Sequence, residues 1–311
     1  MSVTGQVVAG SDHAHRSARV LGPSDLPGAL AVCAADPVAA VLAATRLEVA
    51  SRAGLVAAGG QAWGWPGTGP LQAICWAGAN LVPVVPRRLV PDAADQAAAV
   101  AAFGVRARRT GRRSSSIVGE SGPALALWAD LERFWPAARD VRPHQPSMAI
   151  AQDPDVEPDP RVRLSTPDDL GVILPACIAM FTEEVGYSPV IGGTAYRERV
   201  RSLIAEGRSY ARLAPTPAGG RGARSDGPAV EFKAELGAVA QGVAQVQGVW
   251  VDPALRGRGL SEGGMAAVVA DARRRVAPVI SLYVNGYNVK ALKAYRRVGF
   301  EQVGTFATVL F

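Results

Sequence analysis

One stretch, Gly248 to Ser261, constrains this chain more than any other. It reads Gly-Val-Trp-Val-Asp-Pro-Ala-Leu-Arg-Gly-Arg-Gly-Leu-Ser. The β-branched and aromatic residues at its start predict a strand, and Asp252-Pro253 predicts the turn that ends it. Ser261 predicts the cap of a following helix. Taken alone, a basic Gly-rich turn before a helix is also explained as an ordinary strand-to-helix connection.

This order of elements also predicts an anion site. Gly257 and Gly259 have no Cβ, so the backbone there can curl with its N–H groups pointing inward. The start of the helix adds the positive end of its dipole. Arg256 and Arg258 place cationic donors beside the same point.

A second pattern follows about 25 residues later. Residues 282–285 predict a strand, and Asn288 opens a predicted helix that Gly299-Phe300 closes. Ala291 and Tyr295 lie one turn apart on one face of this helix. Two such patterns in this order are much less frequent by chance than either one alone.

Together these residues resemble a known superfamily. Val251-x-Pro253-x-x-Arg256-Gly257-x-Gly259-Leu260 is similar to the acyl-CoA pyrophosphate loop of the GNAT acyltransferases, with one departure, Ser261 at the final small position. The spacing from Asn288 to Gly299-Phe300 also resembles the last conserved helix of that superfamily. The resemblance implies an α+β fold over residues 161–311, in which helices flank a GNAT-type mixed, mainly antiparallel sheet.

The resemblance implies a cofactor site for acetyl-CoA, the acyl donor. Its expected residues are the strand, the glycine turn and the cap of the last helix: Val249, Trp250, Val251, Arg256, Gly257, Arg258, Gly259, Leu260, Ser261 and Asn288. Asn288 is also explained as a simple helix N-cap.

The resemblance further implies direct transfer of the acyl group to an amine in a ternary complex. Tyr295 is the implied general acid for the leaving thiolate, although a tyrosine on a helix face is also an ordinary core residue. Many relatives carry a Glu general base where this chain has Gln247, which cannot accept a proton. Glu235 on the preceding strand, a water relay, or Glu183 and Glu184 near the expected acceptor site are the alternatives.

Before the resembling half, the chain predicts a smaller α/β domain. We expect a disordered N-terminus at 1–18, an N-terminal domain at 19–152, an acidic Pro-rich linker at 153–160 and the acyltransferase domain at 161–311. Two interpretations of 19–152 remain: a degenerate GNAT-like half that has lost its cofactor loop, or an unrelated small α/β domain.

Composition and charge limit the kinds of partner that the protein can have. No apolar run is long enough to cross a bilayer, and the 311-residue chain predicts a cytoplasmic protein without a membrane or metal partner. Three scattered cysteines support neither disulfides nor zinc. The net charge of +6 is compatible with nucleic acid, but the basic run from Arg106 to Arg113 has no aromatic residues for base stacking, so we interpret it as a solvated linker.

The sequence therefore predicts an N-acetyltransferase that moves an acetyl group from acetyl-CoA to an unidentified amine. The competing hypothesis is a non-catalytic acyl-CoA-binding or protein-interaction module, which Gln247 and the loop-less first half keep open. The acceptor, the acyl chain length and the oligomeric state are not encoded in any motif.

Overall fold

The computed structural model describes residues 16–190, 193–215 and 229–311. Most of the predicted disordered segment 1–18 lies outside these residues. The chain forms two compact units: unit 1 comprises 1–147, 283–286 and 302–311, and unit 2 comprises 148–282 and 287–301. Each unit is described by itself.

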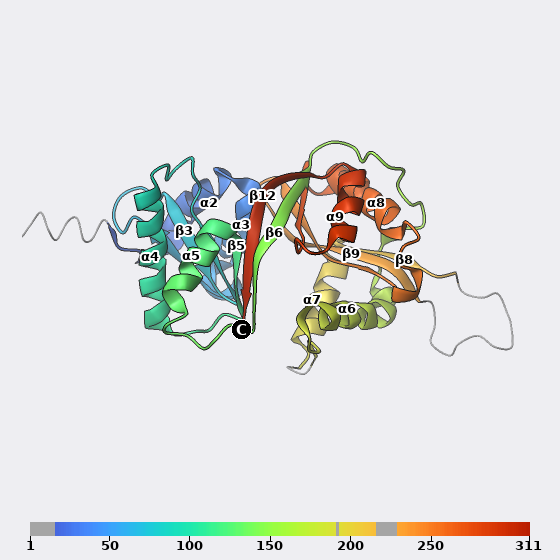
Figure 1. Cartoon of the computed structure of the whole chain (residues 1–311), viewed down its shortest axis with the longest axis horizontal. Helices are drawn as coiled ribbons and strands as arrows, with labels where there is room; N and C mark the ends of the chain where they lie inside the picture. The colour runs from blue at the N-terminus through green and yellow to red at the C-terminus, as the bar shows by residue number, and fades with distance from the viewer. Residues whose placement is uncertain (1–15, 191–192, 216–228) are drawn as a thin grey trace, which may run out of the picture. The chain divides into compact units, whose positions relative to one another are not determined.

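Unit 1 is a mainly antiparallel sheet with a pair of helices on each face (Figure 1). Its strands pair in the order β1-β2-β3-β4-β5-β12, and only β4 and β5 are parallel. Helices α4 and α5 bury their apolar faces in one core, which α2 and α3 do not enter. The elements are β1 (Arg19–Val20), α2 (Leu26–Ala34), α3 (Pro37–Ala57), β2 (Gln61–Trp65), β3 (Ala73–Ala77), β4 (Asn80–Val84), α4 (Ala93–Thr110), β5 (Ser116–Glu120), α5 (Ser121–Leu131), β6 (Asp140–Ile150) and β12 (Glu301–Leu310).

Unit 2 repeats this plan. Its strands pair in the order β7-β8-β9-β10-β11, and only β10 and β11 are parallel. Helices α6 and α7 share one core with β8 and β9. The elements are β7 (Arg163–Leu164), α6 (Leu170–Val185), α7 (Ala195–Ala205), β8 (Ser209–Leu213), β9 (Val230–Ala240), β10 (Val243–Val251), α8 (Leu260–Arg275), β11 (Val279–Tyr283) and α9 (Val289–Val298).

The two halves of the chain carry the same order of elements, and a local ion pair recurs in both. Arg19 on β1 pairs with Asp25 at 3.3 Å, and Arg163 on β7 pairs with Asp169 at 2.6 Å. Each aspartate also accepts a backbone N–H three residues before it, so it fixes the turn into the next helix. The Arg163 bond is the main reason that the pKa of Asp169 falls to about 2. The fold is thus a duplication, with this turn as its shared starting point.

One strand departs from two contiguous halves. β12, the last strand of the chain, groups with unit 1 and pairs antiparallel with β5, from Phe306 opposite Glu120 to Leu310 opposite Ser116. The edge of the unit 1 sheet is therefore extended by a strand from the other end of the sequence.

Local sequence signals account for the breaks between elements of unit 1. Pro37 begins α3 after α2 has ended, and the Asp36 carboxylate caps α3 by accepting from the N–H of Ala39. A turn at Gly78 joins β3 to β4. One interpretation was wrong: Arg106 to Thr110 are the last turn of α4 rather than a linker, because the apolar face of that helix continues through the buried Ala107.

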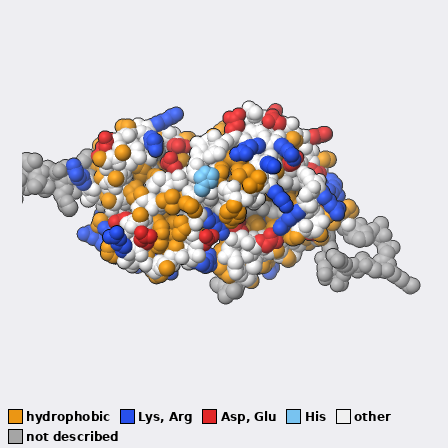
Figure 2. Space-filling view, in the orientation of Figure 1, with side chains coloured by type: hydrophobic (Ala, Val, Ile, Leu, Met, Phe, Trp, Pro, Cys, Tyr) orange, Lys and Arg blue, Asp and Glu red, His pale blue; other side chains and the backbone are white. Residues whose placement is uncertain are grey.

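None of the described helices combines the length and the apolar character that a membrane crossing requires. On the face shown in Figure 2, the Lys and Arg side chains lie in separate groups with acidic and apolar side chains between them. A continuous basic surface of the kind that follows a nucleic-acid backbone is not seen on that face.

Candidate functional site

The glycine turn after β10 has the curled backbone that the sequence predicts. Gly257 and Gly259 have φ angles of +81° and +78°, a region that residues with a Cβ rarely adopt. A Cβ added at either position would meet no other atom within 4 Å, so backbone conformation rather than crowding requires glycine here. The turn is open to solvent.

The helix that follows begins at Leu260 without a side-chain cap, so the prediction that Ser261 caps it was wrong. Gly259 is the N-cap of α8, and the first helical bonds run from the N–H groups of Glu262 and Gly263 to its carbonyl. Among the described residues, the N–H groups of residues 257 to 261 have no hydrogen-bond acceptor. Five consecutive donors at the positive end of a helix dipole form a site suited to a phosphate or diphosphate.

The two arginines of the turn differ. The Arg256 guanidinium bonds the Glu183 carboxylate at 2.7 Å and the carbonyl of Val251 at 3.1 Å. Arg258 is exposed and makes no ion pair or hydrogen bond within the described part of the chain. Arg258 is therefore the cation available to a ligand, whereas Arg256 first has to leave Glu183.

Next to the turn, β10 is no longer paired with the parallel strand β11. Only Val243 to Gln245 pair with β11, from Val279 to Ser281. In residues 246–251, which have no described partner on β11, pairing on the other side with β9 is confined to Val246, Gln247, Trp250 and Val251. The backbone of Val249, Trp250 and Val251 thus lies at a free strand edge, where an extended ligand can pair with it.

A bulge bends β10 at the point where this edge begins. The register with β9 shifts between Gln247 and Trp250, and Gly248 has a φ of +60°. The fully buried Lys233 ammonium donates to the Gly248 carbonyl at 2.9 Å. A Cβ at Gly248 would lie about 3.1 Å from Glu235 and 3.2 Å from Lys233, so only glycine fits above this pair.

Lys233 and Glu235 form a buried ion pair on β9, with the Nζ–Oε1 distance at 2.8 Å. Burial alone would raise the pKa of Glu235, but the charge of Lys233 together with the hydrogen bonds from Lys233 and Cys177 outweighs it, and the pKa lies below its usual range. The Cys177 thiol donates to the same carboxylate at 3.2 Å. Burial raises the pKa of Cys177 to about 12, so this residue is a thiol and not a nucleophilic thiolate.

Gln247 and the two acceptor-site candidates occupy separate positions. Gln247 lies opposite Glu235 and donates to Gln245 at 3.0 Å. Glu183 bridges the cofactor-loop residues, because it accepts from both Arg256 and the Trp250 indole, the latter at 3.4 Å. Glu184 instead lies near Tyr295, whose pKa its charge raises.

Tyr295 lies on the buried face of α9, with its ring edge-on to Phe300 at 6.0 Å between centroids. Its hydroxyl has no hydrogen-bond partner within the described residues. Burial, and then the charge of Glu184, raises the pKa of Tyr295. The phenol therefore keeps its proton at neutral pH, as a general acid must.

Asn288 caps α9 as the sequence predicts, with its side-chain oxygen accepting from the N–H of Ala291 at 3.2 Å. Sequence reasoning missed Lys233, although a lysine two residues before a glutamate on an apolar strand indicates a pair on one face. It also missed Tyr196, whose hydroxyl donates to the Cys177 carbonyl at 3.0 Å and holds α7 against α6. Among the described residues, no cluster of three or more His, Cys, Asp or Glu could hold a metal ion.

Comparisons with known proteins agree with this geometry. Residues 194–300 match the family model described as Acetyltransferase (GNAT) family, and residues 60–173 match one described as Domain of unknown function (DUF4081). An uncharacterized N-acetyltransferase, MJ1207 of Methanocaldococcus jannaschii, is 33% identical over 60 residues, which cover 19% of this chain and 26% of that protein. The chain thus matches about a quarter of the length of that curated relative.

Solved structures resemble the whole chain at low sequence identity. A Drosophila structural-genomics target has a TM-score of 0.60 at 13% identity, with 94% of this chain and 98% of that chain covered. A GCN5-related N-acetyltransferase from Sphaerobacter thermophilus has a TM-score of 0.53 at 17% identity and covers 94% and 95%. A tandem GNAT protein from the clavulanic acid biosynthesis pathway has a TM-score of 0.52 at 16% identity and covers 94% and 98%. These similarities confirm the predicted GNAT-type fold and a tandem arrangement of it.

Proposed function

We propose that this chain, whose residues 194–300 match the GNAT acetyltransferase family, transfers an acetyl group from acetyl-CoA to a primary amine. The observation that carries the proposal is the open amide turn at residues 257–261. It combines two glycines at positive φ, an uncapped helix start and an unpaired arginine. This is the chemistry that recognises a diphosphate, and diphosphate is the group that all CoA esters share.

Under this proposal each part of the site has one task. The amides of 257–261 and the Arg258 side chain hold the diphosphate. The free edge of β10 at Val249, Trp250 and Val251 aligns the pantetheine arm, and a backbone N–H of this edge stabilises the negative charge that develops on the thioester oxygen. Asn288 caps the start of α9, the helix that carries Tyr295.

Tyr295 is the proposed general acid for the leaving thiolate. Its raised pKa keeps it protonated over the neutral range, and its hydroxyl has no competing acceptor among the described residues. A positioned acid of this kind contributes roughly 10²- to 10⁴-fold to a rate.

Glu235 fits a positioning role better than the role of general base. Its pKa is lowered and Lys233 neutralises its charge, so it is a weak proton acceptor for an ammonium group. Gln247 is not a base either, and Glu183 is engaged by Arg256. We therefore assign removal of the amine proton to a water relay, with Glu184 as the carboxylate whose charge acts on the proposed acid.

The test is a transfer assay with purified protein, acetyl-CoA and a panel of small amines, peptides and aminoglycosides, with release of free CoA thiol as the readout. We expect thiol release with at least one amine. The charge-reversed variant Arg258→Glu should weaken CoA binding by about 100-fold while the far-UV circular dichroism spectrum is unchanged. Unchanged CoA affinity in this variant would remove the site assignment.

A second candidate function is a non-catalytic acyl-CoA-binding module. The ion-paired Glu235 and the amide at Gln247 favour it, because neither offers a base. If CoA raises the melting temperature but no amine in the panel releases thiol, this function replaces the transferase.

A further inference from the structure

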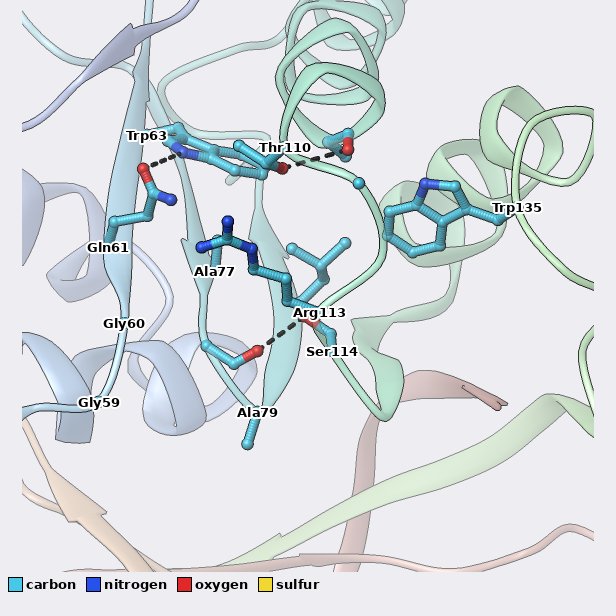
Figure 3. A pocket seen from close by; sticks show the side chains of 14 residues that line it. Gly59, Gly60, Gln61, Trp63, Ala77, Ala79, Thr110, Arg113, Ser114 and Trp135 are labelled. Carbon is cyan, nitrogen blue, oxygen red and sulfur yellow. Dashed lines mark hydrogen bonds between the residues drawn. The ribbon is translucent and has the colours of Figure 1, made fainter.

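Unit 1 contains a cavity of its own, of about 440 Å³, shown in Figure 3. This volume falls within the range of about 300–1,000 Å³ that is typical of small-molecule sites. The residues that line it come from the segment before β2, the β3–β4 turn, the end of α4 and the loop to β5, with Trp135 from beyond α5: Gly59, Gly60, Gln61, Trp63, Ala77, Gly78, Ala79, Leu81, Ala107, Thr110, Gly111, Arg113, Ser114 and Trp135.

The cavity lies at the opposite end of the sheet from the segment that corresponds to the glycine turn of unit 2. It opens at the first residues of β4 and near the start of β5, the end at which these two parallel strands are paired. The segment that corresponds to the glycine turn, residues 85–92, follows the last residue of β4. The cavity is therefore not a second copy of the candidate acyl-CoA site.

Two indole rings form part of its wall. Trp63 on β2 is almost fully buried, and its Nε1 donates to the Gln61 side-chain oxygen at 3.2 Å. Trp135 enters from the other side, as Figure 3 shows, and its buried Nε1 has no acceptor among the described residues. Flat aromatic walls favour a ligand with a flat ring, which stacks on them or meets them edge-on.

The only charged side chain in the lining is Arg113. It is exposed, it has no ion pair or hydrogen bond within the described residues, and in Figure 3 it extends toward the strand that carries Gln61 and Trp63. No Asp or Glu lines the cavity. The negative end of the α4 dipole lies at the rim, but Arg108 and Arg109 in the last turn of that helix offset it.

Of the neutral polar side chains, Gln61 offers a ligand a donor. Its oxygen is occupied by Trp63, so its NH₂ group remains. The hydroxyl of Ser114 donates to the Gly78 carbonyl at 2.7 Å, and the hydroxyl of Thr110 donates to carbonyls of α4, so these two hydroxyls have used their protons. The donors left for a ligand are thus Arg113, the Gln61 NH₂ group and the Trp135 Nε1–H, and they favour a ligand that brings acceptors.

We propose that the cavity of unit 1 binds a small aromatic carboxylate, with its carboxylate on Arg113 and Gln61 and its ring against Trp63 and Trp135. This site is separate from the proposed acyl transfer, and it assigns a ligand-binding role to the region that matches a domain of unknown function.

The test is isothermal titration calorimetry of the full chain with two probes of equal shape, indole-3-acetate and its neutral amide, indole-3-acetamide. We expect the acid to bind at least about tenfold more tightly than the amide, because only the acid forms a charged pair with Arg113. Arg113→Gln should abolish this difference. The matched control is Arg88→Gln, which removes an exposed arginine of the loop at the opposite end of the sheet and should keep the difference.

Three outcomes would overturn the proposal. The acid and the amide bind equally, neither binds at about 1 mM, or Arg113→Gln leaves the preference for the acid intact. A titration in the presence of saturating CoA shows which unit binds the probe. The affinity for indole-3-acetate should stay the same, whereas displacement by CoA would place the probe in unit 2 and contradict the assignment. Acetyl transfer by Arg113→Gln should match the parent chain, which separates failure here from failure of the proposed function.

Discussion

The same device, a parallel strand followed by a loop and a helix, occurs once in each unit, and the two copies differ at the helix start. In unit 2 the helix α8 begins at Gly259 with no side-chain cap. In unit 1 the helix α4 begins at Asp92, whose carboxylate accepts from the N–H groups of Ala94 and Asp95 at 2.7 and 3.3 Å. One helix start is open to an anion, and the other is filled by an anion of its own chain.

This difference accounts for the different roles that we propose for the two units. A helix N-terminus attracts negative charge wherever it occurs, so what decides its function is whether the protein supplies that charge. The loop of unit 1, residues 85–92, also lacks glycine, and hence lacks the curled backbone of unit 2. Unit 1 keeps the framework and uses it for stability.

The strands beneath these loops differ in the same way. β3, the neighbour of β4, is built from Ala, Ile, Cys and Trp and carries no charge. β9, the neighbour of β10, buries the Lys233–Glu235 pair under the Gly248 bulge. A buried pair is costly to desolvate and contributes little net stability, so its presence in unit 2 alone points to a positioning role at the bulge.

Removing the charge of Lys233 should give the largest effect on stability. Lys233→Met leaves Glu235 buried without its partner and should lower the free energy of unfolding by about 3–5 kcal/mol, measured by urea denaturation. The matched control Lys290→Met removes an exposed lysine and should change it by less than about 0.5 kcal/mol.

The double variant Lys233→Met/Glu235→Leu separates stability from positioning. The variant strand β9 then carries no buried charge, as in β3, so most of the lost stability should return. Acetyl transfer should stay low because the Gly248 carbonyl has lost its donor. Recovery of full activity in the double variant would show that the pair is structural only.

The ion pair between Lys233 and Glu235 also predicts a pH dependence of stability. The stability that the intact pair contributes should be present at neutral pH. It should fall in acid as Glu235 is protonated, below the usual carboxylate pKa, and in strong base as Lys233 loses its proton.

The helices that follow the parallel strands give the second test. α9 carries Tyr295 on its buried face, whereas α5 has no tyrosine. Tyr295→Phe should lower kcat by about 100-fold with little change in KM for acetyl-CoA. Because its pKa is raised, the acid form of Tyr295 should persist to above about pH 10, and the rate should lose this contribution only as the pH rises past that value. Tyr287→Phe, at an exposed tyrosine, is the control, and a normal kcat for the Tyr295 variant would contradict the assignment.

A third test places an aspartate, like the Asp92 cap of α4 in unit 1, at the start of α8 in unit 2. Gly259→Asp places a carboxylate at the start of α8, where it competes for the free amides, and should weaken CoA binding by about 100-fold. Gly259→Ala imposes a similar strain at the φ of +78° but adds no charge, and should cost less than tenfold. Calorimetric titration with CoA compares them, and equal losses would mean that backbone shape, not amide occupancy, makes the site.

Local chemistry made much of unit 2 predictable. The glycines at 257 and 259 act through their own backbone, and the Asn288 side chain caps the helix that begins at the next residue, so sequence spacing alone located the turn and the start of α9. The duplication was also present in the sequence: Arg19, Pro23, Asp25, Leu26 and Cys33 recur at identical spacing as Arg163, Pro167, Asp169, Leu170 and Cys177. A search for internal repeats would have found it.

Long-range pairing was not predictable in the same way. The β12–β5 pairing joins residues near 306 to residues near 120, and no local propensity encodes that choice. The function of Lys233 likewise depends on Gly248, which reaches it only through the bulge between two strands. Electrostatic partners such as Arg256 with Glu183 are set by the fold, so composition could not separate the engaged arginine from the free one.

The smallest expected effect comes from opening the helix of unit 1. Asp92→Ala removes the cap of α4 and should lower the free energy of unfolding by about 1 kcal/mol. Asp95→Ala, in the same turn but outside the cap, should cost only a few tenths of that, through the dipole alone. Neither variant should create a second CoA site, because the loop before α4 has no glycine to turn its amides inward. A titration of Asp92→Ala that shows two CoA per chain would mean that the aspartate alone closes unit 1, and that its backbone has kept the shape of an acyl-CoA loop.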